Sequence, residues 1–328
     1  MHWSHRYRSY QRQLLSFNRS LNQRIAGYQT PELFQEPVGS KVSRQRSVGF
    51  FPRIQTVWTE PHTFEASQHI RKGVHSIWYE GLPIDMELTR SHSKVLIVVF
   101  HGALGCDAVL PVFPGANVTR GLGVARLSFS DPTLYLSPKL PLAWYAGNQF
   151  QTDLQSVITR IIRKVAVSIG AKRIVLFGSS GGGFASLIQA AALPEAVVVV
   201  ANAQTDVLRY HKDHVNRYIE IAWGGDCDTL VESNAHSAIK RLTAESQIPQ
   251  LLYLQNSTDE FHIRQHLLPL IQAAGEAPNF HLLMGNWGEG HIAPPKGQFR
   301  EVLEAVVSND AYSLRSMGFT PASLYKFS

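Results

Sequence analysis

The chain has 328 residues, 44% hydrophobic and 17% charged, which is enough for one large α/β domain with extensions or for two ordinary domains. Its apolar runs, such as Val95–Phe100 and Ala196–Ala201, are far shorter than the roughly 18 residues of a membrane-spanning helix, so we expect no transmembrane segment. Two cysteines, Cys106 and Cys227, make no disulfide framework, and the N-terminus lacks the pattern of a secretion signal. A reduced, cytoplasmic location is expected.

The net charge of +6 is concentrated in the first residues of the chain. Residues 1–46 contain eight Lys or Arg and two acidic residues, Glu32 and Glu36, whereas the remaining 282 residues hold 23 of each sign. We therefore assign residues 1–50 to a basic N-terminal extension. Such an extension either remains solvated or contacts nucleic acid, another acidic polymer or an anionic membrane surface.

From about residue 51, apolar runs alternate with amphipathic ones, which predicts a domain over residues 51–312 and a C-terminal tail over residues 313–328. Alternation of this kind is typical of a mostly parallel sheet with helices on both faces. The predicted strands are 76–79, 84–88, 94–100, 123–129, 173–177, 196–201, 250–254 and 279–284. The predicted helices are 153–167, 182–193, 264–273 and 298–307.

Two segments interrupt this alternation. Residues 131–148 form an excursion rich in proline and aromatic residues, and residues 206–249 form a polar insert containing Tyr210, Tyr218 and Trp223. We expect both to shape a pocket, with the insert in the position of a lid. Most of the aromatic residues of the insert are expected to anchor it to the body of the domain.

The stretch RIVLFGSSGGGFASL, residues 173–187, places two serines and four glycines between a predicted strand and a predicted helix. Only Ser180 fits the frame Gly-x-Ser-x-Gly, in which a tight strand-to-helix turn exposes a nucleophilic hydroxyl. A phosphate cradle is the alternative. This sequence, however, has a serine where the dinucleotide-binding fingerprint has its third glycine, and it lacks the Lys-Ser/Thr pair of a P-loop.

An activated serine needs a base, an orienting acid and donors for an oxyanion. His291 is the candidate base, because the loop Gly288–His291 follows the last predicted core strand. Asp259 is the candidate acid, since it follows strand 250–254, with Asp206 and Glu260 as rivals. Of the other histidines, His262 and His266 are either pocket residues or part of a solvated face.

Residues 76–308 resemble the α/β-hydrolases in four features, and the candidate residues follow the order Ser, Asp, His of that family. The features are the strand-to-helix turn around Ser180, the His101-Gly102 turn after strand 94–100, the loop acid Asp259 and the loop histidine His291. The resemblance implies an α/β-hydrolase fold with a lid-like insert, a triad of Ser180, Asp259 and His291, and an acyl-enzyme. It also implies an oxyanion hole formed by the backbone N–H groups of Ala103 and Gly181, with no metal and no cofactor. His101 is expected to order its turn rather than to act as a base.

The fold does not determine the substrate. We expect hydrolysis of a carboxylic ester of a small molecule or glycan. The alternatives are acyl transfer to a glycan or other hydroxyl acceptor, a peptidase, or a non-catalytic binding protein that retains the scaffold.

Overall fold

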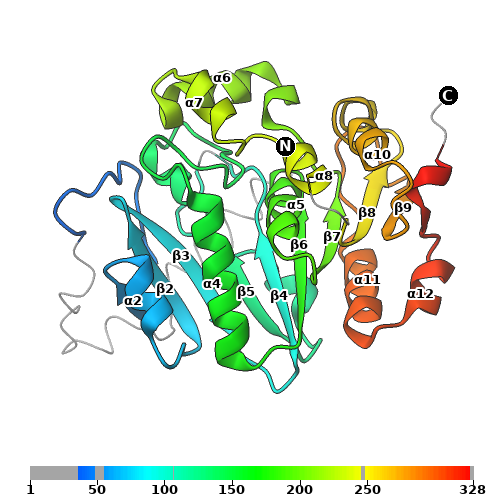
Figure 1. Ribbon diagram of the computed structural model, residues 1–328, viewed down its shortest axis with the longest axis horizontal. Helices are drawn as coiled ribbons and strands as arrows, with labels where there is room; N and C mark the ends of the chain where they lie inside the picture. Colours follow the sequence, from blue (N-terminus) through cyan, green and yellow to red (C-terminus); the bar gives the residue numbers. More distant parts are fainter. Residues whose placement is uncertain (1–35, 49–54, 106, 245–247, 326–328) are drawn as a thin grey trace.

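In the part of the chain that the structure describes, ten strands form one sheet in the order β1-β2-β3-β5-β4-β6-β7-β8-β9-β10. Figure 1 shows this order from β2 to β9. The computed structural model describes residues 36–48, 55–105, 107–244 and 248–325. Neighbouring strands are parallel, except that β3 is antiparallel to β2 and β5, and β10 to β9. The strands are β1 (Gln55–Trp58), β2 (Gly73–Tyr79), β3 (Leu82–Thr89), β4 (Val95–Phe100), β5 (Ala125–Phe129), β6 (Arg173–Ser179), β7 (Val197–Ala201), β8 (Gln250–Asn256), β9 (Phe280–Gly285) and β10 (Thr320–Pro321).

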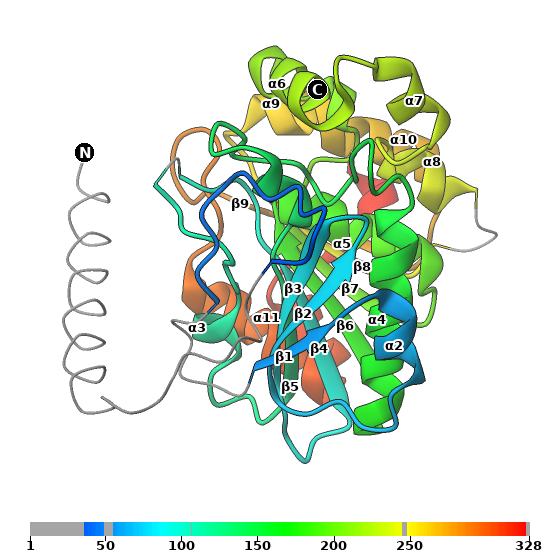
Figure 2. The ribbon, with the colours of Figure 1, turned by 90° about the vertical axis from the view of Figure 1, so that its left-hand side faces the viewer.

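Helices cover both faces of the sheet, as Figure 2 shows with the sheet between α4 and α11. The helices of the described residues are α2 (Pro61–Ala66), α3 (Ala116–Thr119), α4 (Leu154–Ile169), α5 (Gly181–Ala192), α6 (Lys212–Trp223), α7 (Cys227–Glu232), α8 (Ala238–Thr243), α9 (Glu260–His262), α10 (Leu268–Ala274), α11 (Lys296–Ser308) and α12 (Ala311–Ser316). Short 3-10 turns span Pro132–Leu136, Val207–Arg209 and Ala322–Leu324.

The alternation of side chains along each strand divides the core into two layers. In β4, Leu96, Val98 and Phe100 pack in one layer with α4 and α5, whereas the intervening valines and isoleucine pack in the other with α3 and α11. All six residues of β4 are buried, as expected for a strand covered on both sides. The predicted α/β-hydrolase fold is confirmed at this level.

β4 lies at the point where the strand order reverses, because β5 flanks it on one side and β6 on the other. In open α/β sheets, the loops at the carboxyl ends of the strands diverge at such a point and leave room for a ligand. The turns after β4 and β6 carry His101 and Ser180. The topology therefore places the two predicted motifs next to each other.

The structure contains two edge strands and six helices (α2, α3, α6, α7, α8 and α12) that were not predicted from the sequence, and it divides one predicted helix. β1 and β10 were not predicted because four and two residues leave no periodic pattern to recognise. The helix predicted over 264–273 is divided into a π-helical turn, Ile263–Leu267, and α10, which has a proline in its first turn. Pro269 has no N–H for the helical ladder, which explains the division.

The predicted ends of the domain lie elsewhere than the sequence suggested. α12 crosses the boundary expected after residue 312, and β10 pairs with β9, so residues 313–325 belong to the sheet and its helices. At the other end, residues 43–48 lie against the domain: Ser43 and Arg44 donate backbone N–H groups to Tyr135 O, and Ser47 donates to Leu110 O. We refer to residues 43–48 as the N-terminal strap.

The basic residues of the described part of the extension contact their own domain. Arg44 donates to the carbonyl oxygens of Leu140 and Ala108, and Arg46 forms a buried ion pair with Asp85 at 2.6 Å. The other basic residues, apart from Lys41, and the expected contact with an acidic polymer or membrane lie outside the described residues. Within the described residues, no helix is both long and apolar enough to cross a membrane.

The described residues of the insert over 206–249 form the helices α6, α7 and α8, and α8 packs against α5 and α10 in the helical layer. Tyr218 is fully buried and donates its hydroxyl to Gly147 O at 2.8 Å, and its ring packs edge-on against Trp144. Aromatic residues of the insert thus anchor it to the excursion over 131–148. The excursion in turn places Trp144 beside the turn that follows β6.

Candidate active site

Ser180 lies in the turn between β6 and α5 with φ 53° and ψ −122°, a positive φ that residues other than glycine rarely adopt. The turn is possible because its neighbours lack side chains. A Cβ on Gly178 would lie 2.3 Å from Gly182 O, and a Cβ on Gly182 would lie 2.3 Å from Phe100 O. The Ser180 N–H donates to Ala201 O at 3.0 Å, which ties the turn to β7. The hydroxyl is thereby held at the carboxyl edge of the sheet.

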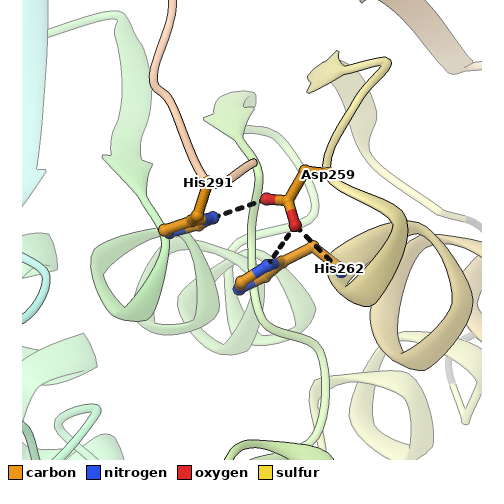
Figure 3. Close-up of side chains that lie close together, drawn as sticks. All are labelled: Asp259, His262 and His291. Atoms are coloured by element: carbon orange, nitrogen blue, oxygen red, sulfur yellow. Dashed lines mark hydrogen bonds and ion pairs between the residues drawn. The ribbon is translucent and has the colours of Figure 1, made fainter. Parts of the chain in front are cut away.

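His291 lies between Ser180 and Asp259. Its Nε2 is 3.0 Å from Ser180 Oγ. Its Nδ1 is 2.6 Å from Asp259 Oδ2, the contact drawn in Figure 3. Because an ionised carboxylate only accepts hydrogen bonds, Nδ1 carries the proton and Nε2 is left to accept the serine proton. The three residues that the sequence pointed to are brought together with hydrogen-bonding geometry.

The loop that carries His291 is held by side chains from the ends of β7 and β8. Asn256 donates through Nδ2 to Gly288 O at 2.8 Å and to Gly290 O at 2.6 Å, and Asn202 donates to Ile292 O at 2.8 Å. Both asparagines are buried. The His291 side chain is 37% exposed, so the loop is fixed by these bonds rather than by burial.

The two rival acids point elsewhere. Asp206 accepts a hydrogen bond from Leu208 N and begins the short helix after β7, whereas Glu260 is exposed and lies 3.5 Å from Arg264. Asp259 alone of the three contacts His291. Burial by itself would raise the pKa of Asp259, but hydrogen bonds from His262 and His291 outweigh burial and hold that pKa well below its usual range. The carboxylate therefore stays ionised.

His101 orders the turn after β4, as expected. Its Nδ1 donates to Gly102 O at 2.7 Å, and its Nε2 accepts from Asp131 N at 3.1 Å. Burial lowers the pKa of His101 to about 4, so the ring is neutral at pH 7. Since C=O and N–H of a trans peptide point in opposite directions, the bond from His101 to Gly102 O turns the Ala103 N–H away from His101.

The turn after β4 approaches the turn that carries Ser180 and Gly181. A Cβ on Gly102 would lie 3.5 Å from Ser180 Cβ and 3.7 Å from Gly181 N, which shows how closely the turns approach. Gly181 is the first residue of α5, so its N–H has no partner within the helix. The N–H groups of Ala103 and Gly181 are where the sequence placed an oxyanion hole, and that role remains a prediction.

Gln204 and His262 contact the triad, and sequence reasoning did not place either in it. Gln204 Nε2 lies 2.9 Å from Ser180 Oγ and 3.3 Å from His262 Nε2. His262 Nδ1 lies 2.9 Å from Asp259 Oδ1, and its ring stacks on His291 at 3.9 Å between centroids. Gln204 follows β7 just as Asp259 follows β8, so a search for polar residues after strands would have found it.

The cluster of Asp259, His262 and His291 also has donor atoms close enough for a metal ion, all within 4.8 Å of one another. In both histidines, however, Nδ1 is already bonded to the carboxylate (Figure 3). A metal would have to displace those two protons. Hydrogen bonding accounts for the arrangement.

A cleft of about 520 Å³ lies away from these residues, between residues 37–41, α2 and the turn joining β2 to β3. Its lining mixes basic side chains (Lys41, Arg160) with acidic ones (Glu60, Glu80). None of the triad residues lines it. The candidate active site around Ser180 is therefore separate from this cleft.

No known protein family matches the sequence, and no curated protein is similar to it. Solved structures are similar in fold. The capsule O-acetyltransferase of Neisseria meningitidis serogroup A has a TM-score of 0.55 at 15% identity, over 70% of this chain and 95% of that one. Dipeptidyl peptidase 4 of Porphyromonas gingivalis has a TM-score of 0.53 at 13% identity, over 74% of this chain and 36% of that one.

An S-formylglutathione hydrolase from Agrobacterium tumefaciens is similar with a TM-score of 0.50 at 12% identity, over 77% of this chain and 99% of that one. At such identities the likeness concerns the path of the backbone and not the activity. Together with the mixed sheet and the helices on both of its faces, these similarities show that the chain has an α/β-hydrolase fold.

Proposed function

We propose that the chain is a serine hydrolase that cleaves a carboxylic ester through an acyl-enzyme. The observation that carries the proposal is the continuous path from Ser180 Oγ to His291 and on to Asp259, with distances of 3.0 and 2.6 Å. A hydroxyl, an imidazole and a buried carboxylate in this order are what nucleophilic acyl transfer requires.

In the acylation half, His291 Nε2 takes the Ser180 proton while Oγ bonds to the ester carbonyl carbon. The electron pair of the C=O bond moves to its oxygen, where the N–H groups of Ala103 and Gly181 would stabilise the charge. Asp259, ionised and bonded to Nδ1, stabilises the imidazolium. When the C=O bond re-forms, the alcohol leaves with the proton from His291.

In the second half, His291 takes a proton from water, the resulting hydroxide attacks the acyl carbon, and Oγ leaves with that proton. The His291 side chain is 37% exposed, so water can reach Nε2. One solved structure of similar fold is described as a capsule O-acetyltransferase. A sugar hydroxyl is therefore the acceptor that we would compare with water.

Replacing Ser180 by alanine is expected to lower turnover of short p-nitrophenyl esters at least about a thousandfold, because the nucleophile is lost. It should also abolish labelling by a fluorophosphonate probe. Ser179→Ala is the matched control, since it removes the neighbouring hydroxyl and leaves Ser180 in place. Full turnover by the Ser180→Ala variant would contradict the assignment.

Product analysis with and without a sugar acceptor distinguishes hydrolysis from transfer, and a peptide panel tests the peptidase alternative. Folded wild-type protein that neither reacts with the probe nor cleaves any ester would favour a binding protein on the same scaffold.

A further inference from the structure

We propose that Gln204 and His262 form a second hydrogen-bonded path from Ser180 to Asp259, alongside His291, and that this path holds the serine hydroxyl in its reactive direction. The inference deepens the proposed function and rests on it. It assigns Gln204 a contact with the reacting oxygen and makes His262 a positioning residue.

The direction of every bond in this path follows from Trp144. Its indole N–H can only donate, and it lies 2.7 Å from Gln204 Oε1. The amide nitrogen of Gln204 therefore faces Ser180 Oγ at 2.9 Å and His262 Nε2 at 3.3 Å, with one hydrogen available for each. His262 Nε2 must then accept, so Nδ1 carries the proton that is donated to Asp259 Oδ1 at 2.9 Å.

The path restricts the rotation of the Asp259 carboxylate and of the Ser180 hydroxyl. Asp259 accepts from His291 at one oxygen, and from the ring and the backbone N–H of His262 at the other, so the carboxylate cannot rotate without losing a bond. Ser180 Oγ accepts from Gln204 and has one proton to give. That proton is left for His291 Nε2, 3.0 Å away.

The same contacts suit the charges that develop during reaction. The N–H of Gln204 continues to face Oγ when the serine proton has moved to His291, and a donor there stabilises the oxygen as it attacks and as it leaves. The ring of His262 lies against that of His291 at 3.9 Å and 15°. Burial lowers the pKa of His262, so a neutral aromatic face meets the imidazolium.

All members of the path except Ser180 are buried: Gln204 is 0%, His262 1% and Trp144 1% exposed. Water therefore does not compete for their hydrogen bonds, and a missing partner is not readily replaced. Removing one of these side chains should therefore leave the others free to change the orientation of their hydrogen bonds.

The first experiment measures the rate of fluorophosphonate labelling and ester turnover in Gln204→Leu and His262→Phe, with folding checked by the unfolding midpoint. His262→Phe keeps a ring for stacking but loses both hydrogen bonds. Each variant should lose about tenfold to a hundredfold in kcat with KM little changed, as expected when a reacting group is misdirected. The double variant should lose no more than the larger single loss, because the two residues act as one path.

Gln189→Leu is the matched control. Gln189 is a buried glutamine of α5 that accepts from Thr159 and donates to Gln155 O, so its loss costs stability without touching the triad. It should react at the wild-type rate. Wild-type labelling by the Gln204→Leu variant, or losses that multiply in the double variant, would overturn the inference while the Ser180 assignment stands.

The second experiment does not depend on activity. Nitrogen NMR of labelled histidines should find His262 protonated at Nδ1 in the wild type, with Nε2 changing its signal in Gln204→Leu. If the protein does not react at all, the proposed function fails, and this spectrum still decides the path. A proton on Nε2 of His262 at neutral pH would exclude it.

Discussion

At the scale of single residues, glycines allow the backbone segments around the candidate site to approach one another closely, because a glycine has no side chain. Gly182 lies against the carbonyl of Phe100, and Gly183 lies so close to Ala203 that a Cβ would approach it to 2.6 Å. These contacts bring α5 against β4 and the segment after β7. The glycines that the sequence indicated as spacers are thus the points at which α5 contacts the end of β4 and the segment after β7.

Gly182→Ala is expected to destabilise the protein by roughly 1–3 kcal/mol or more, because the new Cβ would lie 2.3 Å from the backbone oxygen of Phe100. Urea unfolding measures the change. Gly297→Ala is the matched control in α11, where a Cβ meets nothing within 4 Å and a helical Gly→Ala change favours folding by up to about 1 kcal/mol. Equal stability of the two variants would contradict the tight packing.

At the scale of elements, the N-terminal strap connects two segments that flank the site. Arg44 donates to Ala108 O, which follows the His101-Gly102 turn, and to Leu140 O in the excursion over 131–148. The same two segments are joined by the bond from Leu104 N to Pro141 O at 2.8 Å. Through Arg44, the strap therefore stabilises the segment that carries Ala103.

Arg44→Met should lower the free energy of unfolding by about 1–3 kcal/mol, because two carbonyl oxygens lose a charged donor. The change is measured by urea unfolding, with fluorophosphonate labelling as a second readout that should slow if the turn shifts. Arg160→Met provides the comparison: its ion pair with Glu65 is partly exposed, and such pairs contribute about 0–1 kcal/mol. A strap that only rests on the surface would make the two variants alike.

At the scale of the whole molecule, buried neutral histidines link stability to pH. Burial lowers the pKa of His101 to about 4 and that of His266 to about 3, against about 6.5 in the unfolded chain. Below pH 6.5 the unfolded state therefore binds protons that the folded state does not, and stability falls on acidification. Asp131, whose pKa burial raises to about 6, acts in the opposite direction between pH 6 and 3.8 but offsets only part of this.

The free energy of unfolding is expected to decrease from pH 6.5 to 4, with each of the two histidines contributing about 3 kcal/mol at 1.36 kcal/mol per pH unit. Urea unfolding across this range measures it. In His266→Asn the amide oxygen can still accept from Thr205 N, so the variant should fold, and the decrease should be smaller by about 3 kcal/mol, the contribution of His266. An unchanged pH dependence would show that His266 is protonated in the fold.

The core strands could be predicted from the sequence, and Ser180, Asp259 and His291 could be proposed as a triad, because both signals are local. A buried strand is a run of apolar residues, and Ser180, Asp259 and His291 each follow such a run. Gln204, Asn202 and Asn256 were not predicted as parts of the site, because their roles depend on contacts with segments 24 to 90 residues away. His262 was expected to be either a pocket residue or part of a solvated face, and the choice depends on the orientation of its ring, which the sequence does not give. The strap was not predicted either. Its arginines were interpreted as solvated or bound to a partner, because Asp85 and the carbonyl oxygens that they contact are distant in the sequence.

The dependence of the His291 loop on asparagine has a consequence for chemical ageing. Hydrolysis of the Asn256 amide would replace a donor of two hydrogen bonds by a carboxylate that faces the oxygens of Gly288 and Gly290. The loop would be repelled while the sheet stayed folded, and side-chain amides are among the groups most easily lost on heating. The lifetime of activity during storage would then be shorter than the lifetime of the fold, and a mass increase of about one dalton at this position would mark the inactive molecules.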